Sequence, residues 1–138
     1  MKFKYQSEID SLSLSPCLIE FNHVENKPAF RWVFADINDV RNFVPVASKD
    51  RLAKRNTVKH WALSFYRTEN ESVSALKHLY NDKPNLFKVL GTHIAHGVIN
   101  SEHGICEIKV EDDGHFNHIE YENVDFSVNN FKIVKDLF

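Results

Sequence analysis

The strongest local constraint on the fold is a strand-like segment that runs directly into a helix start. Residues 60–66 are short, apolar and aromatic, which is typical of a central β-strand. Thr68 and Glu71 then match a capping box, in which a hydroxyl and a carboxylate each satisfy a backbone N–H at a helix start. The residues that repeat at helical spacing after this box are Val73, Leu76, Leu79 and Tyr80. The sequence therefore predicts a capped helix over about residues 69–80.

The segments before this helix alternate in a way that favours strands. Residues 17–23 and 30–34 each indicate a strand, with Phe30, Trp32 and Phe34 on one face of the second. The turn residues at 26–28 lie between them, so we expect a hairpin. A short helix is expected over residues 36–43, because apolar residues follow a polar start and Pro45 ends the run.

The segments after the central helix also favour strands. Residues 93–99 are predicted to be extended, and residues 105–110 and 115–121 flank an Asp-Gly pair, which is a strong hairpin signal. Residues 131–134 indicate a last strand. Strands at both ends with helices between them predict an α+β fold with a mainly antiparallel sheet, one capped central helix and shorter helical segments. No repeat or linker divides the 138 residues, so we expect a single compact domain.

Composition excludes several classes of protein. Hydrophobic residues make up 43% of the chain and charged residues 26%, as in ordinary soluble globular proteins. No apolar run approaches the roughly 20 residues that a membrane helix needs, and the first residues lack the apolar core of a secretory signal. We therefore expect a cytoplasmic protein without a membrane partner. Cys17 and Cys106 are too few for a disulfide framework and are expected to be buried.

The charge is unevenly distributed along the chain. The net charge is -2, but residues 1–100 hold fourteen basic and ten acidic residues, whereas residues 101–138 hold three and nine. A basic segment at residues 49–59 carries Arg51, Lys54, Arg55 and Lys59. Such a run is either an ordinary solvated face or a surface for phosphates or an acidic partner. Our first hypothesis is a binding or regulatory module whose basic segment engages an acidic protein surface or nucleic acid.

Histidines suggest a second class of function, a small enzyme. Two His-x-x-His pairs, His93 with His96 and His115 with His118, lie close together in the sequence. A transition metal is one interpretation, but residues three apart on a strand point to opposite faces, so a site would need one histidine from each segment. We predict no metal. Without metal, the same side chains are candidates for general acid–base catalysis on a nucleotide or RNA.

Other catalytic signatures are weak or absent. Phosphate-loop and dinucleotide motifs do not occur, so no cofactor is predicted. Ser64 lacks the flanking glycines of a nucleophile elbow. Arg31, Ser64 and Glu120 follow the order of residues found in folds that transfer ADP-ribose, which leaves that chemistry as one form of the enzyme hypothesis.

A third class of function is an inhibitor or interaction protein that acts through acidic side chains. The acidic residues near the C-terminus that would serve this role are Glu107, Glu111, Asp112, Asp113, Glu120 and Glu122.

Overall fold

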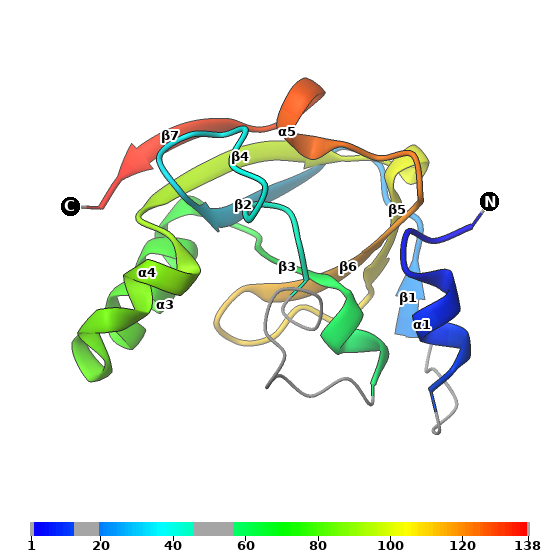
Figure 1. Cartoon of the computed structure of the whole chain (residues 1–138), viewed down its shortest axis with the longest axis horizontal. Coiled ribbons are helices and arrows are strands. Elements are labelled where there is room, and N and C mark those ends of the chain that lie inside the picture. The colour runs from blue at the N-terminus through cyan, green and yellow to red at the C-terminus, as the bar shows by residue number, and fades with distance from the viewer. Residues whose placement is uncertain (1, 13–19, 46–56, 138) are drawn as a thin grey trace.

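The computed structural model describes residues 2–12, 20–45 and 57–137 and shows one antiparallel sheet flanked by short helices (Figure 1). The sheet has seven strands in the order β1-β5-β6-β3-β2-β4-β7. The strands are β1 (Phe21–Asn22), β2 (Lys27–Val33), β3 (Leu63–Tyr66), β4 (His93–Ile99), β5 (Gly104–Glu107), β6 (His115–Glu120) and β7 (Lys132–Asp136). This architecture confirms the expected α+β class.

Helical segments connect the strands and cover parts of both faces of the sheet. They are α1 (Gln6–Asp10), η2 (Val58–Trp61), α3 (Glu69–Asp82), η3 (Pro84–Leu86), α4 (Phe87–Leu90), η4 (Ser101–His103) and α5 (Phe126–Asn129). In Figure 1, α3 lies below β2 and β4, whereas α5 lies above them. No helix among the described residues is long and apolar enough to cross a bilayer.

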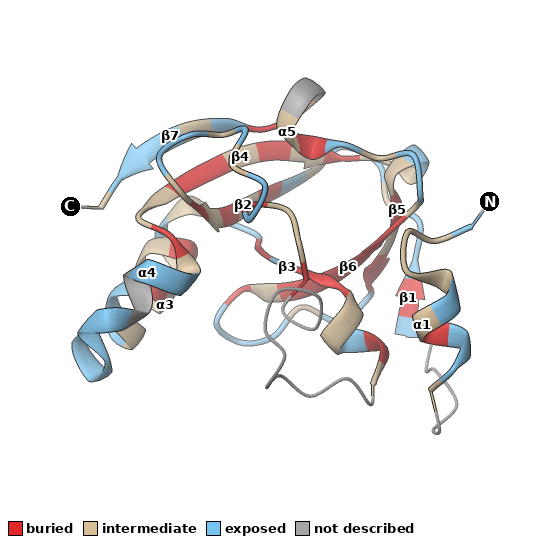
Figure 2. Cartoon of the chain, viewed as in Figure 1, coloured by how far each residue is buried: buried red, intermediate tan, exposed pale blue. Residues whose placement is uncertain are grey.

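The two faces of the sheet differ in how they are covered. On β2, Ala29, Arg31 and Val33 are buried on the face that we call the inner face, and Phe30 and Trp32 are half-buried on the opposite, outer face. The connection after β2 and the segment around α5 cover the inner face. Helix α3 covers part of the outer face, where Trp32 Nε1 donates to the Ser72 carbonyl at 3.0 Å. Figure 2 shows the resulting contrast between the buried β4 and β6 and the exposed edge strand β7.

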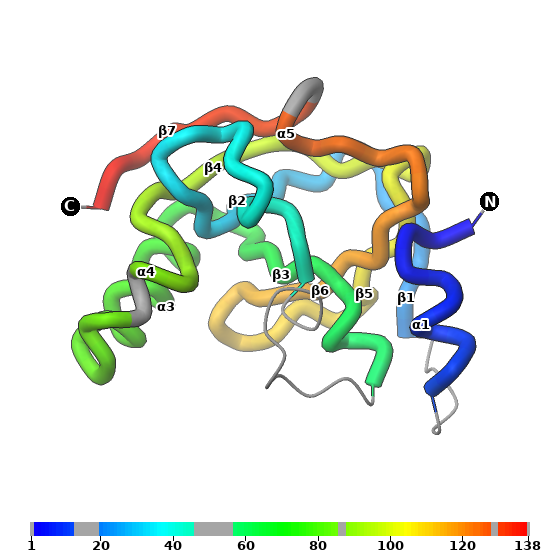
Figure 3. The backbone as a smooth tube through the Cα atoms, in the orientation of Figure 1, coloured from blue at the N-terminus to red at the C-terminus, as the bar shows by residue number. Residues whose placement is uncertain are grey.

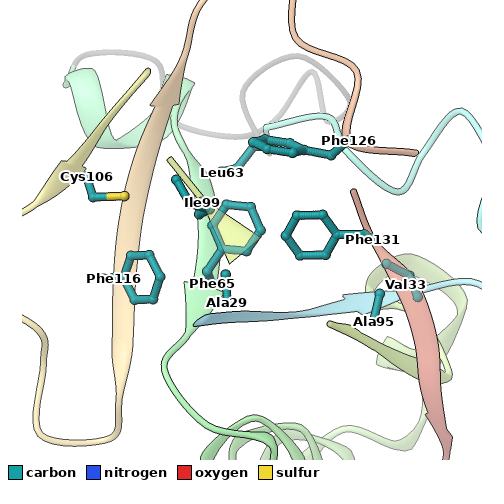
Figure 4. Packing of buried hydrophobic residues seen from close by; sticks show 10 residues of the cluster. All are labelled: Ala29, Val33, Leu63, Phe65, Ala95, Ile99, Cys106, Phe116, Phe126 and Phe131. Carbon is teal, nitrogen blue, oxygen red and sulfur yellow. The ribbon is translucent and has the colours of Figure 1, made fainter. Parts of the chain in front are cut away.

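Phenylalanine rings fill the inner face. Phe65 of β3 lies at the centre, with ring centroids 5.9 Å from Phe116, 5.9 Å from Phe126 and 5.6 Å from Phe131 (Figure 4). All four rings are almost fully buried. Phe43 contacts Phe126 and Phe131 from the connection after β2. This core therefore joins β3, β6, α5 and two irregular segments, and it positions β3 in the middle of the sheet.

The predicted N-terminal hairpin is wrong. Strand β1 pairs with β5, and β2 pairs with β3 and β4, so the chain crosses from one edge of the sheet to its other half between them (Figure 3). Phe21 is buried with Ile9, Val58, Ala62 and Ile119 in a second apolar cluster. Burial of β1 in that cluster outweighs the local turn signal at residues 26–28, because a turn fixes only neighbouring residues.

The predicted helix over residues 36–43 is also absent, and turns take its place. Asp36 and Asp39 accept hydrogen bonds from the backbone N–H groups two residues further on, at 2.9 and 3.0 Å. The Asn42 amide donates to the Asp36 and Ile37 carbonyls, and its Oδ1 accepts from the Phe34 backbone N–H. Short polar side chains here replace the hydrogen bonds that a helix would make.

The central helix and the C-terminal strands agree with the sequence. Helix α3 begins after Thr68, whose hydroxyl accepts from the Glu71 backbone N–H at 3.2 Å. The Glu71 carboxylate, however, pairs with Arg67 at 2.9 Å and accepts from the Thr68 hydroxyl, so only half of the capping box forms as expected. Strands β5 and β6 form the predicted hairpin, and β4 and β7 match the expected extended segments.

Gly104, the first residue of β5, provides a stability test of this hairpin. Its φ is 139°, and a Cβ there would meet the Ile119 carbonyl oxygen on the paired strand. Gly104→Ala is therefore expected to lower the free energy of unfolding by about 2–4 kcal/mol, measured by urea denaturation. Ser74→Ala, on the exposed face of α3, is the control and should change it by less than about 0.5 kcal/mol. Equal effects of the two variants would contradict this assignment of strain.

Candidate functional site

A cavity of about 190 Å³ opens beside β3, and we call it the β3 pocket. It lies among η2, β3, the start of β6, the end of α4 and the connection after β2. Its apolar wall is formed by Trp32, Val44, Pro45, Ala62 and Leu90. Its polar lining residues are Arg31, Lys59, Ser64, Tyr66 and His115.

Antiparallel register explains why these polar side chains meet. Ser64 pairs with Asn117, and Tyr66 pairs with His115, so the side chains of Tyr66 and His115 project from the same face of neighbouring strands. Their rings pack edge to face at 5.6 Å. Trp32 of β2 stacks on the Tyr66 ring at 5.4 Å. The pocket therefore has an aromatic wall made by three neighbouring strands of the sheet, β2, β3 and β6.

Three residues that line the pocket each carry a polar side-chain atom without a hydrogen-bond partner among residues 2–12, 20–45 and 57–137. These groups are the Ser64 hydroxyl, the Tyr66 hydroxyl and Nε2 of His115. Burial raises the pKa of Tyr66, with smaller contributions from the Asp113 and Glu111 charges, so its hydroxyl stays protonated at neutral pH. The three groups are thus available to a ligand as donors or acceptors.

His115 lies beside two carboxylates. Its Nδ1 lies 3.3 Å from Glu111 Oε1, and its backbone N–H donates to Asp113 Oδ1 at 3.1 Å. The side chain is 18% exposed. A carboxylate beside Nδ1 favours the tautomer that carries its proton on Nδ1, which leaves the lone pair on Nε2. In that tautomer, Nε2 can accept a hydrogen bond.

Two cations border the pocket. The Arg31 guanidinium is buried and donates to the carbonyls of Asn42 and Ser64, each at 2.7 Å. Burial lowers the pKa of Arg31 to about 10, so it remains charged at neutral pH. Lys59 Nζ lies 3.2 Å from Glu107 Oε2, and this contact raises the pKa of the lysine. The Lys59 side chain is 48% exposed, so it can also reach a ligand.

The other predicted histidines lie elsewhere. Strands β4 and β6 are separated by β2 and β3, so His93 and His96 are roughly 14 Å from the histidines of β6 at the usual strand spacing. His96 stacks on Phe30 at 4.5 Å, and His93 Nδ1 contacts the Thr92 hydroxyl. His118 is fully buried on the inner face, and neither of its ring nitrogens has a partner among the described residues.

These positions do not form a metal site. Within the described ranges, no group of three or more His, Cys, Asp or Glu side chains is arranged to hold a metal ion. Of the four histidines singled out from the sequence, His115 alone lines the β3 pocket.

The residues considered for ADP-ribose transfer are only partly brought together. Arg31 and Ser64 line the β3 pocket, but Glu120 lies on the inner face, where its carboxylate pairs with Lys4 Nζ at 3.0 Å. Burial raises the pKa of Glu120. Glu120, the third residue of the expected ADP-ribose-transfer set, is therefore not part of the β3 pocket.

Most of the basic segment falls outside the described residues. Arg51, Lys54 and Arg55 lie outside the described residues. Of the four candidate binding residues, only Lys59 has a described position. Several acidic residues considered for a protein-binding surface have partners inside the molecule. Glu107 pairs with Lys59, and Glu111 lies beside His115.

No match was found for this chain among protein-family models, curated proteins or solved structures.

Trp32 and Tyr66 are the aromatic pocket residues that the sequence did not reveal as site residues, and the aliphatic lining residues were not predicted either. Alternation within residues 30–34 and 60–66 indicates which side chains share a face of each strand. It does not indicate that the two strands are neighbours, and this pairing is what places the two rings together.

Proposed function

We propose that this chain is a binding module for single-stranded nucleic acid. One unstacked nucleotide of the bound strand enters the β3 pocket. The observation that carries the proposal is the convergence of the stacked Trp32 and Tyr66 rings with unpartnered hydroxyl and imidazole groups and with two cations. Bases stack on aromatic side chains with about 1–3 kcal/mol each, and basic side chains hold the phosphates.

Pocket size supports a single nucleotide unit. A cleft that encloses a drug-sized ligand usually measures about 300–1,000 Å³. The 190 Å³ of the β3 pocket is smaller and suits one base, with the rest of the strand outside. The Ser64 and Tyr66 hydroxyls would then hydrogen bond to the edge of that base.

The position of the basic segment in the sequence supports phosphate contacts. Pro45 and Lys59 both line the pocket, and the segment that contains Arg51, Lys54 and Arg55 connects them. An aromatic pocket favours nucleic acid over an acidic protein surface, the other partner considered for this segment. Bases stack on aromatic rings, whereas Asp and Glu side chains have no aromatic face.

The test is fluorescence anisotropy with a labelled single strand of roughly 12 nucleotides at low and physiological salt. We expect Tyr66→Ala to weaken binding about 10-fold, because it removes a stacking partner. The double variant Arg51→Glu, Arg55→Glu should weaken binding by a similar or larger factor and reduce its salt dependence. The control Lys132→Glu, Lys135→Glu makes the same charge change on the edge strand β7 and should have an effect below about 3-fold.

Intrinsic fluorescence gives an independent readout of the pocket. The chain has two tryptophans, so Trp61→Phe leaves Trp32 as the single reporter. Its emission should be quenched on strand binding. Absence of binding at low salt would overturn the proposal. Tighter binding of polyglutamate than of any strand would instead support an acidic protein partner.

A further inference from the structure

We propose that the β3 pocket also cleaves RNA, with Nε2 of His115 as the general base that takes the proton of a ribose 2′-hydroxyl. This inference rests on the proposed binding of a single strand to the same pocket. It adds a reaction and a substrate class, because a 2′-hydroxyl is present in RNA and absent from DNA.

The surroundings of His115 meet the geometric requirements for a base. Glu111 lies 3.3 Å from Nδ1, a position from which its carboxylate can orient the ring, while Nε2 has no partner in the described part of the chain and the residue lines the pocket. The Tyr66 ring packs against the imidazole and limits its rotation. A nucleophile-activating base in turn oriented by a third group is the usual arrangement in hydrolytic and transfer sites.

Other histidines lack this combination. His118 is fully buried, whereas the His78 side chain is 80% exposed on α3. Nδ1 of His103 accepts from the Asn100 backbone N–H, and His96 stacks on Phe30 outside the pocket. Among the described histidines, the combination of a carboxylate beside one ring nitrogen and an unpartnered nitrogen in the β3 pocket therefore belongs to His115.

The cleavage reaction needs no metal ion and consumes no second substrate. His115 accepts the 2′-hydroxyl proton, the 2′-oxygen forms a bond to the adjacent phosphorus, and the bond between phosphorus and the 5′-oxygen breaks. The departing 5′-oxygen takes a proton from water, and the imidazolium returns its proton to the resulting hydroxide. The products are a 2′,3′-cyclic phosphate and a 5′-hydroxyl end.

The two cations at the pocket suit the charge that develops during this step. Negative charge accumulates on the phosphate oxygens as the 2′-oxygen attacks, and fixed positive groups stabilise it. Lys59 is exposed enough to reach a phosphate, and the buried Arg31 contributes its charge from the pocket wall. The protonated Tyr66 hydroxyl is a further donor.

The experiment compares cleavage and binding on matched strands. The substrate is a pool of random-sequence RNA of roughly 20 nucleotides, and the binding probe is the same pool made as DNA. We expect the wild-type chain to cut RNA, to leave DNA intact and to give 2′,3′-cyclic phosphate ends by mass spectrometry. His115→Gln should lower the cleavage rate at least about 100-fold, whereas DNA binding, to which the imidazole contributes one of several contacts, should weaken by no more than about 10-fold.

Matched variants separate the base from its positioning residue. Glu111→Gln should lower kcat about 10-fold without changing KM, and Glu111→Asp should restore part of that loss. His78→Gln is the control, because it removes an exposed histidine that also lies beside a carboxylate, and it should cleave at the wild-type rate. The same purification for all variants separates the activity of this chain from contaminating nucleases.

Two outcomes distinguish failure of this inference from failure of the proposed function. If the chain binds the DNA pool but His115→Gln cuts RNA as fast as wild type, or if neither cuts, catalysis by His115 is overturned and the binding function stands. If neither pool binds at low salt, both proposals fall.

Discussion

Phe65→Ala is expected to lower the free energy of unfolding by about 3–5 kcal/mol, measured by urea denaturation with far-UV circular dichroism. Phe65 is fully buried at the centre of the inner face, and its ring packs against those of Phe116, Phe126 and Phe131. Truncation removes the transfer free energy of the ring and leaves a cavity that rigid aromatic neighbours fill poorly.

The control for this prediction is Val40→Ala. Val40 is 85% exposed, so its truncation should change the free energy of unfolding by less than about 0.5 kcal/mol. A loss below about 1 kcal/mol for Phe65→Ala would mean that α5 and the connection after β2 do not pack on the inner face as described.

His118→Leu is expected to stabilise the protein, and increasingly so as the pH falls. Both ring nitrogens of His118 are buried without a partner among the described residues, so its removal should add about 1–3 kcal/mol near pH 7. Burial also lowers the pKa of His118 to about 3, with smaller contributions from His103 and Lys4.

The sign of the pH dependence follows from this shift. Between the unfolded pKa near 6.5 and the folded pKa near 3, the unfolded chain binds a proton at this position and the folded chain does not. Wild-type stability is therefore lost as the pH falls through that window, by at most about 1.4 kcal/mol per pH unit from this histidine. His118→Leu should remove that part of the slope in denaturation curves between pH 6 and pH 4.

Other titrating groups do not obscure the comparison. The raised pKa of Glu120 acts in the opposite direction, because its folded form holds a proton that the unfolded form has lost. Its contribution is common to wild type and variant and cancels in their difference. The control His78→Leu removes an exposed histidine and should leave the slope unchanged. Parallel curves for wild type and His118→Leu would contradict a neutral, buried His118.

Features that depend on neighbouring residues were predictable from the sequence. The helix start at Thr68 needs only a hydroxyl and the next turn of backbone, and it forms as expected. The hairpin of β5 and β6 joins strands separated by a short connection, so its pairing costs little chain entropy. Alternation also predicted that His115 and His118 lie on opposite faces, which the structure confirms through their different partners.

The candidate site could be predicted only in part, because it depends on which strands are neighbours. His115, Lys59 and Ser64 were candidates by residue type, for different reasons and in different hypotheses. Their meeting in one pocket with Tyr66 and Trp32 requires β3 to lie between β2 and β6. Nothing in the local sequence specifies that order.

The sequence by itself determined an α+β chain with a capped central helix and strands on either side of it. Only the tertiary structure decided that β1 joins β5, that residues 36–43 form turns, and that the histidines separate while His115 enters the β3 pocket. The physical reason is the distance along the chain over which each interaction acts. Capping and alternation act over a few residues, whereas strand order follows from burying the Phe65 core and the Phe21 cluster together.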